Sequence, residues 1–184
     1  MPEYLSVSFQ YSKKKITDQT IRAFCDVLFS GGVSFDGGCK GNEGASCDEI
    51  IDWNQRKLEQ NFELGYTEHS SHDYKQMRLQ YADFSEVRLF INNEREQDFF
   101  SFELLFLQDE LFVNTAANTR ALQKAQLSKI EKLAVHMWEN ENMDCIQAGW
   151  EVADAPVPHE DIAGGDSPLI DPFCILPKSL FREE

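Results

Sequence analysis

Three consecutive runs of residues between positions 76 and 107 alternate apolar with polar side chains, which is the pattern of strands that bury one face. They span residues 76–81, 87–92 and 99–107, so only five and six residues connect them. Connections this short join antiparallel neighbours, because parallel strands need a crossover of about a dozen residues or more. The chain is therefore expected to contain an antiparallel meander.

Further strands are predicted near both ends of the chain. The first alternates in the same way, with Leu5, Val7, Phe9 and Tyr11 on one side and Ser6, Ser8 and Gln10 on the other. A strand over residues 145–152 and a short one near residues 173–176 complete the set.

Three amphipathic helices are predicted among these strands. Thr17 is expected to cap the first helix, which ends at Gly31-Gly32. The sequence Ser46-Cys47-Asp48-Glu49 has the form of a capping box and starts the second helix. The longest helix is predicted over residues 117–140, where the apolar residues fall within one arc.

Helices grouped between runs of antiparallel strands favour an α+β fold. We expect one two-layer domain over residues 1–184, with a mainly antiparallel sheet and the helices packed on one face. Residues 31–47 and 153–172 concentrate glycine and proline and are predicted to be irregular loops. The shared core is expected to contain Leu5, Val7, Phe9, Leu79, Leu89, Ile130 and Trp150. The other face of the sheet is expected to be open, carrying Ser6, Ser8, Gln10, Arg78, Gln80, Arg88, Ser101, Glu103, Gln147 and Glu151.

The charge of the chain restricts its partners. It has 17 basic and 32 acidic residues and a formal net charge of −15. Nucleic acid and anionic membranes are poor partners for such a surface, because both are bound largely through Lys and Arg. No apolar run approaches the roughly 20 residues of a membrane span, and the first residues lack the pattern of a signal peptide. The expected location is the cytoplasm.

The residues that could form an enzyme or metal site do not have the spacing that such motifs require. The glycine-rich residues 31–41 lack a Lys directly after the last glycine of a phosphate-binding loop. Cys39 and Cys47 lie too far apart to pair as zinc ligands with His69 and His72. The five cysteines are predicted to be reduced thiols. We therefore predict no metal, no cofactor and no catalytic residue.

Acidic residues gather in the irregular segments and the sheet meander, which indicates either a surface that only keeps the chain soluble or one complementary to a basic protein. The partner-binding candidates are Asp154, Glu160, Asp161 and Asp166 of the second loop, together with Arg78, Arg88 and Glu103 of the open sheet face. The carboxylates would speed association, while an apolar or aromatic centre would supply most of the affinity.

In its general plan the chain resembles the small acidic immunity proteins that bacteria make against polymorphic toxins. The resemblance lies in the opening strand from Tyr4 to Tyr11, in the long helix leading into Gly149-Trp150-Glu151, and in the ending from Ile175 to Phe181. It implies a non-enzymatic protein that binds a cognate toxin and blocks its active site or its folding. No residue's role is carried over from this resemblance.

Two other classes of function remain open. One is a small enzyme or ligand-binding protein with a pocket between the 31–47 and 153–172 loops, in which His72 and Asp73 would activate Cys39 or Cys47. The other is a structural or homo-oligomeric module that pairs through the open sheet face. A toxin-like reading frame next to the gene, or co-purification of a basic partner, would favour the binding protein over both classes, and turnover of a small molecule would favour the enzyme.

Overall fold

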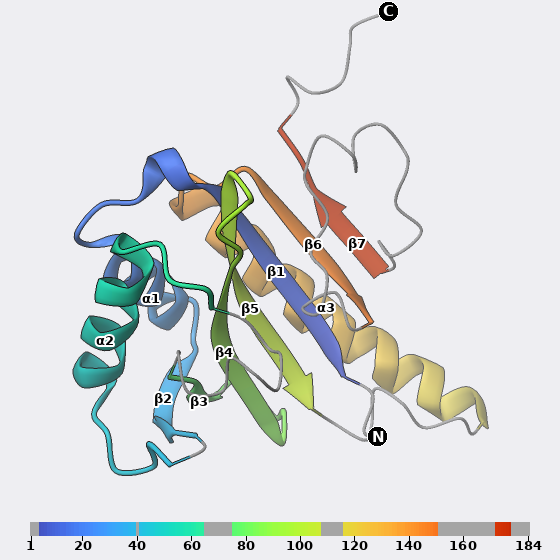
Figure 1. Ribbon diagram of the computed structural model, residues 1–184. Helices are drawn as coiled ribbons and strands as arrows, with labels where there is room; N and C mark the ends of the chain where they lie inside the picture. The colour runs from blue at the N-terminus through green and yellow to red at the C-terminus, as the bar shows by residue number, and fades with distance from the viewer. Residues whose placement is uncertain (1–3, 40, 65–74, 108–115, 151–171, 178–184) are drawn as a thin grey trace, which may run out of the picture.

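The computed structural model describes residues 4–39, 41–64, 75–107, 116–150 and 172–177 (Figure 1). In this part of the chain one sheet has the strand order β2-β3-β4-β5-β1-β6-β7, and every neighbouring pair is antiparallel. Its strands are β1 (Leu5–Ser12), β2 (Ser34–Gly38), β3 (Met77–Gln80), β4 (Glu86–Asn93), β5 (Phe99–Leu107), β6 (Cys145–Trp150) and β7 (Pro172–Ile175). The predicted meander is β3, β4 and β5.

The helices are α1 (Thr20–Ser30), α2 (Cys47–Glu59) and α3 (Ala116–Asn140), with a short 3-10 helix η1 (Lys13–Lys15) after β1. Figure 1 shows α3 crossing behind β5, β1 and β6, while α1 and α2 lie beside β2, β3 and β4. The α+β fold, with a mainly antiparallel sheet and helices on one face, is confirmed. Among the helices in the described ranges, none is both long and apolar enough to cross a bilayer.

The core lies between the helices and the apolar face of the sheet. Phe24 of α1 stacks on Phe102 of β5 with ring centroids 3.9 Å apart, and its ring meets Phe9 of β1 edge-on at 5.3 Å. Six of the expected core residues belong to one buried cluster: Leu5, Val7, Phe9, Leu79, Leu89 and Ile130. The seventh, Trp150, has its backbone in β6, but its side chain is outside the described part of the chain.

The sequence predicted the first residue of α2 correctly but placed the start of α1 too early. The capping box of α2 is present, because Glu49 N donates to Ser46 Oγ (3.2 Å) and Ser46 N donates to Glu49 Oε2 (2.7 Å). The start of α1 at Thr17 was predicted too early, since the N-cap residue is Gln19. Thr17 Oγ1 instead accepts a hydrogen bond from Gln19 N (3.2 Å) in the turn before the helix.

Glycine at position 31 allows α1 and α3 to approach closely. A Cβ atom there would lie 2.8 Å from His136 Cδ2 and 2.9 Å from Leu133 Cδ1, so a larger residue would require these two side chains to shift. His136 Nε2 lies 3.0 Å from Val27 O and 3.0 Å from Ser30 Oγ. The side chain of His136 therefore joins α3 to the end of α1.

The loop predicted over residues 31–47 contains an unpredicted edge strand, β2. Its five residues include two glycines and an aspartate, a composition that disfavours strands, and they pair with β3 through an irregular register. Gly38 is needed at the irregularity, because a Cβ atom would lie 2.0 Å from Asn42 O. This pairing is a tertiary contact, which the local pattern does not reveal.

The sheet face that was predicted to be open is largely buried in the structure. Six polar residues predicted to be exposed are at most 1% exposed: Ser6, Ser8, Gln10, Ser101, Glu103 and Gln147. Phe90 and Leu105 share this face and are buried with them. Only its β3 end is as predicted, since Arg78 and Gln80 are exposed, while Glu151 lies outside the described residues.

Candidate functional site

The structure contradicts the prediction that Glu103 lies on an exposed, partner-binding surface. Its side chain is buried at the centre of the second sheet face, where Ser8 Oγ donates to Glu103 Oε1 at 2.8 Å and Ser101 Oγ donates to the same atom at 2.5 Å. Polar groups that bond one another can be enclosed without exposure to water. The assignment of Glu103 to an exposed partner surface is therefore wrong, and its role in these contacts is to link β5 with β1.

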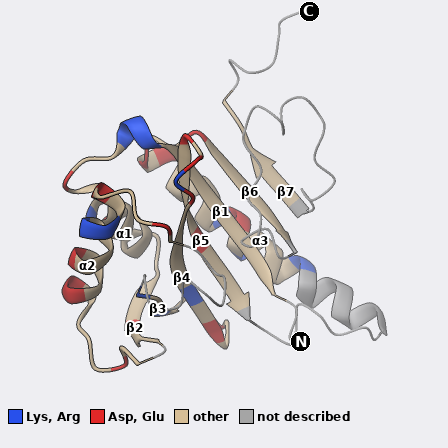
Figure 2. Cartoon of the chain, in the orientation of Figure 1, with Lys and Arg blue, Asp and Glu red and all other residues tan. Residues whose placement is uncertain are grey.

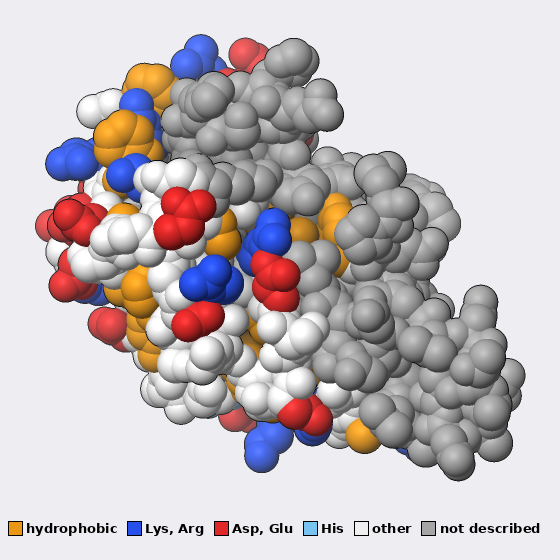
Figure 3. Space-filling view, turned by 90° about the horizontal axis from the view of Figure 1, so that it is seen from below, with side chains coloured by type: hydrophobic (Ala, Val, Ile, Leu, Met, Phe, Trp, Pro, Cys, Tyr) orange, Lys and Arg blue, Asp and Glu red, His pale blue; other side chains and the backbone are white. Residues whose placement is uncertain are grey.

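The two arginines of that prediction are held in ion pairs. Arg78 Nε lies 3.0 Å from Asp36 Oδ2 and joins β3 to β2, while Arg88 Nε donates to Glu86 Oε1 at 2.6 Å within β4. Seen from below, the described surface carries basic and acidic side chains next to one another rather than a patch of one sign (Figure 3). The four loop carboxylates, Asp154, Glu160, Asp161 and Asp166, lie outside the described residues.

The candidate metal and nucleophile residues are not brought into one described site. Cys39 is buried and Cys47 begins α2, whereas His69, His72 and Asp73 lie outside the described residues. Within the described ranges no group of three His, Cys, Asp or Glu side chains is arranged to hold a metal ion. Burial raises the pKa of the Cys39 thiol, which opposes its use as a nucleophile near neutral pH.

Thiol reactivity should follow exposure. Burial raises the pKa of the Cys145 thiol to about 12 and raises that of Cys25 still further, so neither forms thiolate at pH 8. Cys174 in β7 is exposed. We expect a disulfide reagent at pH 8 to modify Cys174 first, and to reach Cys25 and Cys145 only when the protein unfolds. A fast phase that persists in the C174S variant would contradict this assignment.

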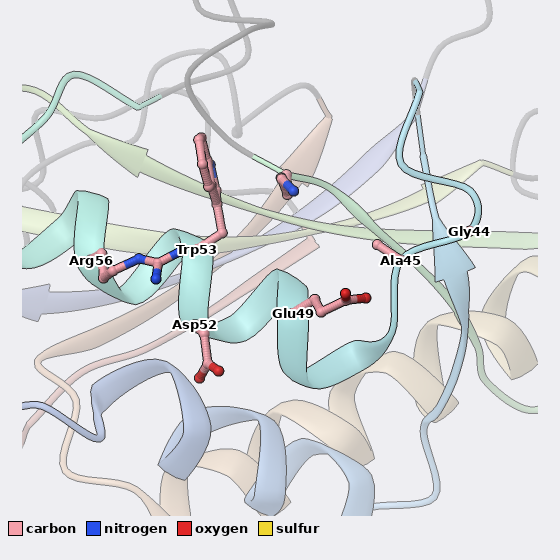
Figure 4. Close-up of a pocket in the computed structure, with 7 residues that line it drawn as sticks. Gly44, Ala45, Glu49, Asp52, Trp53 and Arg56 are labelled. Atoms are coloured by element: carbon pink, nitrogen blue, oxygen red, sulfur yellow. The ribbon is translucent and has the colours of Figure 1, made fainter.

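The outer face of α2 groups charged side chains with a tryptophan. Glu49, Asp52, Trp53 and Arg56 lie at spacings of three and four residues, which places them on one side of the helix. Together with Gly44, Ala45 and Lys75 they line a pocket of about 440 Å³ (Figure 4). The pocket includes Gly44 and Ala45 of the 31–47 segment, while residues 153–172, the other wall of the predicted pocket, lie outside the described part of the chain.

One edge of this face is acidic. Arg22 of α1 pairs with Asp48 (Nη1 to Oδ1, 2.8 Å) and Asp52 (Nη2 to Oδ1, 3.4 Å), whose side chains stay 75% and 65% exposed. Burial raises the pKa of the Cys47 thiol, and the negative charges of Asp48 and Asp26 raise it further. Two exposed carboxylates thus share one guanidinium. Figure 2 shows acidic residues along the α2 helix.

The other edge of the face is aromatic and basic. Lys57 Nζ and Lys75 Nζ lie 5.0 Å and 4.8 Å from the centroid of the Trp53 ring. Lys57 Nζ also lies 4.0 Å from the centroid of Phe62. Figure 4 shows Trp53 and Asp52 pointing toward opposite edges of this face, with Asp52 directed toward α1. Trp53 and Arg56 are three positions apart in α2, so helical spacing alone groups them on one face.

Comparisons of the chain with protein-family models, with curated proteins and with solved structures each found no match. The outer face of α2, defined by Asp48, Glu49, Asp52, Trp53 and Arg56, is the candidate functional site.

Proposed function

We propose that this chain is a non-enzymatic protein-binding module that docks a basic protein on the outer face of α2. In keeping with its resemblance to small acidic immunity proteins, the partner is a toxin whose active site or folding it blocks. The observation that carries the proposal is a half-buried tryptophan beside exposed carboxylates on one helix face.

The carboxylates supply long-range attraction. Asp48 and Asp52 share the single cation of Arg22, and the whole chain carries a net charge of −15. A surface of one sign raises the association rate with a partner of the other sign. The loop acids from Asp154 to Asp166 are proposed to extend the same field.

Trp53 supplies the anchor. Binding energy at protein interfaces concentrates in a few large side chains, with Trp, Tyr and Arg over-represented, and polar groups surround them. Trp53 and Arg56 are neighbours on the α2 face and line the same pocket. Because Arg78 and Arg88 are engaged with Asp36 and Glu86, they are proposed to contribute at the margin of the interface.

Reversing the acidic edge tests the electrostatic part of the proposal. The partner is first captured from the source cell on the parent protein, and association and dissociation rates are then measured at low and high salt. The D48K/D52K variant should associate about tenfold more slowly at low salt, with a small change in dissociation rate. The difference should shrink at high salt, because the Debye length falls from roughly 10 Å at 0.1 M to 3 Å at 1 M.

The matched control is E131K/E139K, which makes the same charge change on exposed positions of α3. A control that slows association as much as D48K/D52K would show that net charge alone matters and would reject the α2 surface. If no protein is captured, and a small-molecule turnover is lost on substituting Cys39 or His72, the binding class itself is rejected in favour of an enzyme.

A further inference from the structure

In the α2 pocket the acidic side chains already have hydrogen-bond or ion-pair partners, whereas the basic side chains have no ion-pair partner among the described residues. Glu49 Oε2 accepts the hydrogen bond from Ser46 N, and such backbone bonds hold the pKa of its carboxyl below the usual range. Asp52 pairs with Arg22. In contrast, no carboxylate of the described residues lies within ion-pair distance of Arg56 or Lys75. The pocket therefore has more available donors than acceptors.

The indole of Trp53 adds a third donor. Trp53 Nε1 is buried and has no hydrogen-bond partner among the described residues. A buried donor without an acceptor costs free energy, so an acceptor brought by a ligand would be favoured there. The ammonium groups of Lys57 and Lys75, near 5 Å from the ring centroid, add positive charge around the same indole.

The position of Lys75 is fixed by its backbone. Asn54 of α2 receives a hydrogen bond from Lys75 N at its Oδ1 (2.9 Å) and donates from Nδ2 to Lys75 O (2.8 Å). Asn54 is itself buried, so the two bonds hold Lys75 next to α2 while its ammonium group stays over Trp53. A pocket of about 440 Å³ is within the range of small-ligand sites.

We infer that this pocket is an oxyanion site, in which a carboxylate or phosphate group lies among the Arg56 guanidinium, the Lys75 ammonium and the Trp53 indole N–H. A cation is a poor occupant, because the two carboxylates that would hold it already have partners. Arg and Lys provide several charge-assisted donors for oxygen acceptors, and such bonds are stronger than neutral ones. The inference goes beyond the proposed function, since it needs no protein partner.

The test follows the indole N–H signal of Trp53 by NMR, assigned with a W53F variant, during titration with pyrophosphate or glutarate. Ionic strength is held constant with sodium chloride. Both probes carry the proposed chemistry, so saturable shifts with either support the site, and the stronger probe distinguishes phosphate from carboxylate. We expect R56Q and K75Q each to weaken binding by about tenfold or more, because each removes a charge-assisted hydrogen bond.

K132Q is the matched control, because Lys132 is an exposed lysine of α3 away from the pocket and its loss changes the net charge equally. It should bind the probe like the parent. No saturable shift with either probe, or unchanged binding in K75Q and R56Q, would overturn the inference. Two separate variants keep the test valid if one of them fails to fold. Association of the protein partner is measured independently, so failure of this site leaves the docking proposal standing.

Discussion

Replacing Phe102 with alanine should lower the free energy of unfolding by about 3 to 5 kcal/mol, the range for deleting a fully buried phenylalanine. Phe102 is 0% exposed, and its ring stacks on Phe24 of α1. Tyr11 and Phe100 also meet this ring edge-on, at 5.6 Å and 5.7 Å. Its removal leaves a cavity between the sheet and α1 and removes contacts from both layers.

The measurement is urea unfolding at equilibrium, and F99A in the same strand is the control. Phe99 lies on the other face of β5 and is only half-buried, so its loss should cost clearly less. Equal losses in F102A and F99A would contradict the placement of the core between the helices and one face of the sheet.

Replacing Trp53 with alanine should speed dissociation of the captured partner by about 30-fold, since anchors of this kind contribute at least about 2 kcal/mol. Short-range contacts are lost after the complex has formed, so the association rate should change little. Surface plasmon resonance with immobilised partner separates the two rates. W53F should recover part of the affinity, because it restores an aromatic ring without the indole N–H.

W138A is the matched control for this variant. Trp138 is a partly buried tryptophan of α3 that packs against the core, so its loss should lower the melting temperature without changing the dissociation rate. If W138A and W53A speed dissociation equally, Trp53 acts through general stability and is not an anchor.

Much of the fold was predictable because its signals are local. The alternation of Met77, Leu79 and their neighbours gave the meander, and Ser46 with Glu49 gave the start of α2. Thr17 carries the right side chain for a cap, yet the helix begins later because Gln55 of α2 accepts a hydrogen bond from Ile21 N and so fixes the first turn. That contact joins residues 34 positions apart, beyond the reach of any local pattern.

Alternation predicted which residues share a sheet face but not whether that face is open. Ser8 and Glu103 are polar, which suggested exposure, but they are buried because they bond each other across β1 and β5. The functional site likewise depends on a contact between residues far apart in the sequence, which a local pattern does not show. Helical spacing groups Trp53 with Arg56, whereas Lys75 reaches them through the buried side chain of Asn54.

The most direct test of the central claim is amide hydrogen exchange of the protein alone and in complex with its captured partner. Docking on α2 predicts that protection rises over residues 47–59 and over the neighbouring turns of α1, while exchange of residues 124–140 in α3 stays unchanged. Protection that rises in α3 or the β7 edge and leaves residues 47–59 unaltered would contradict the account.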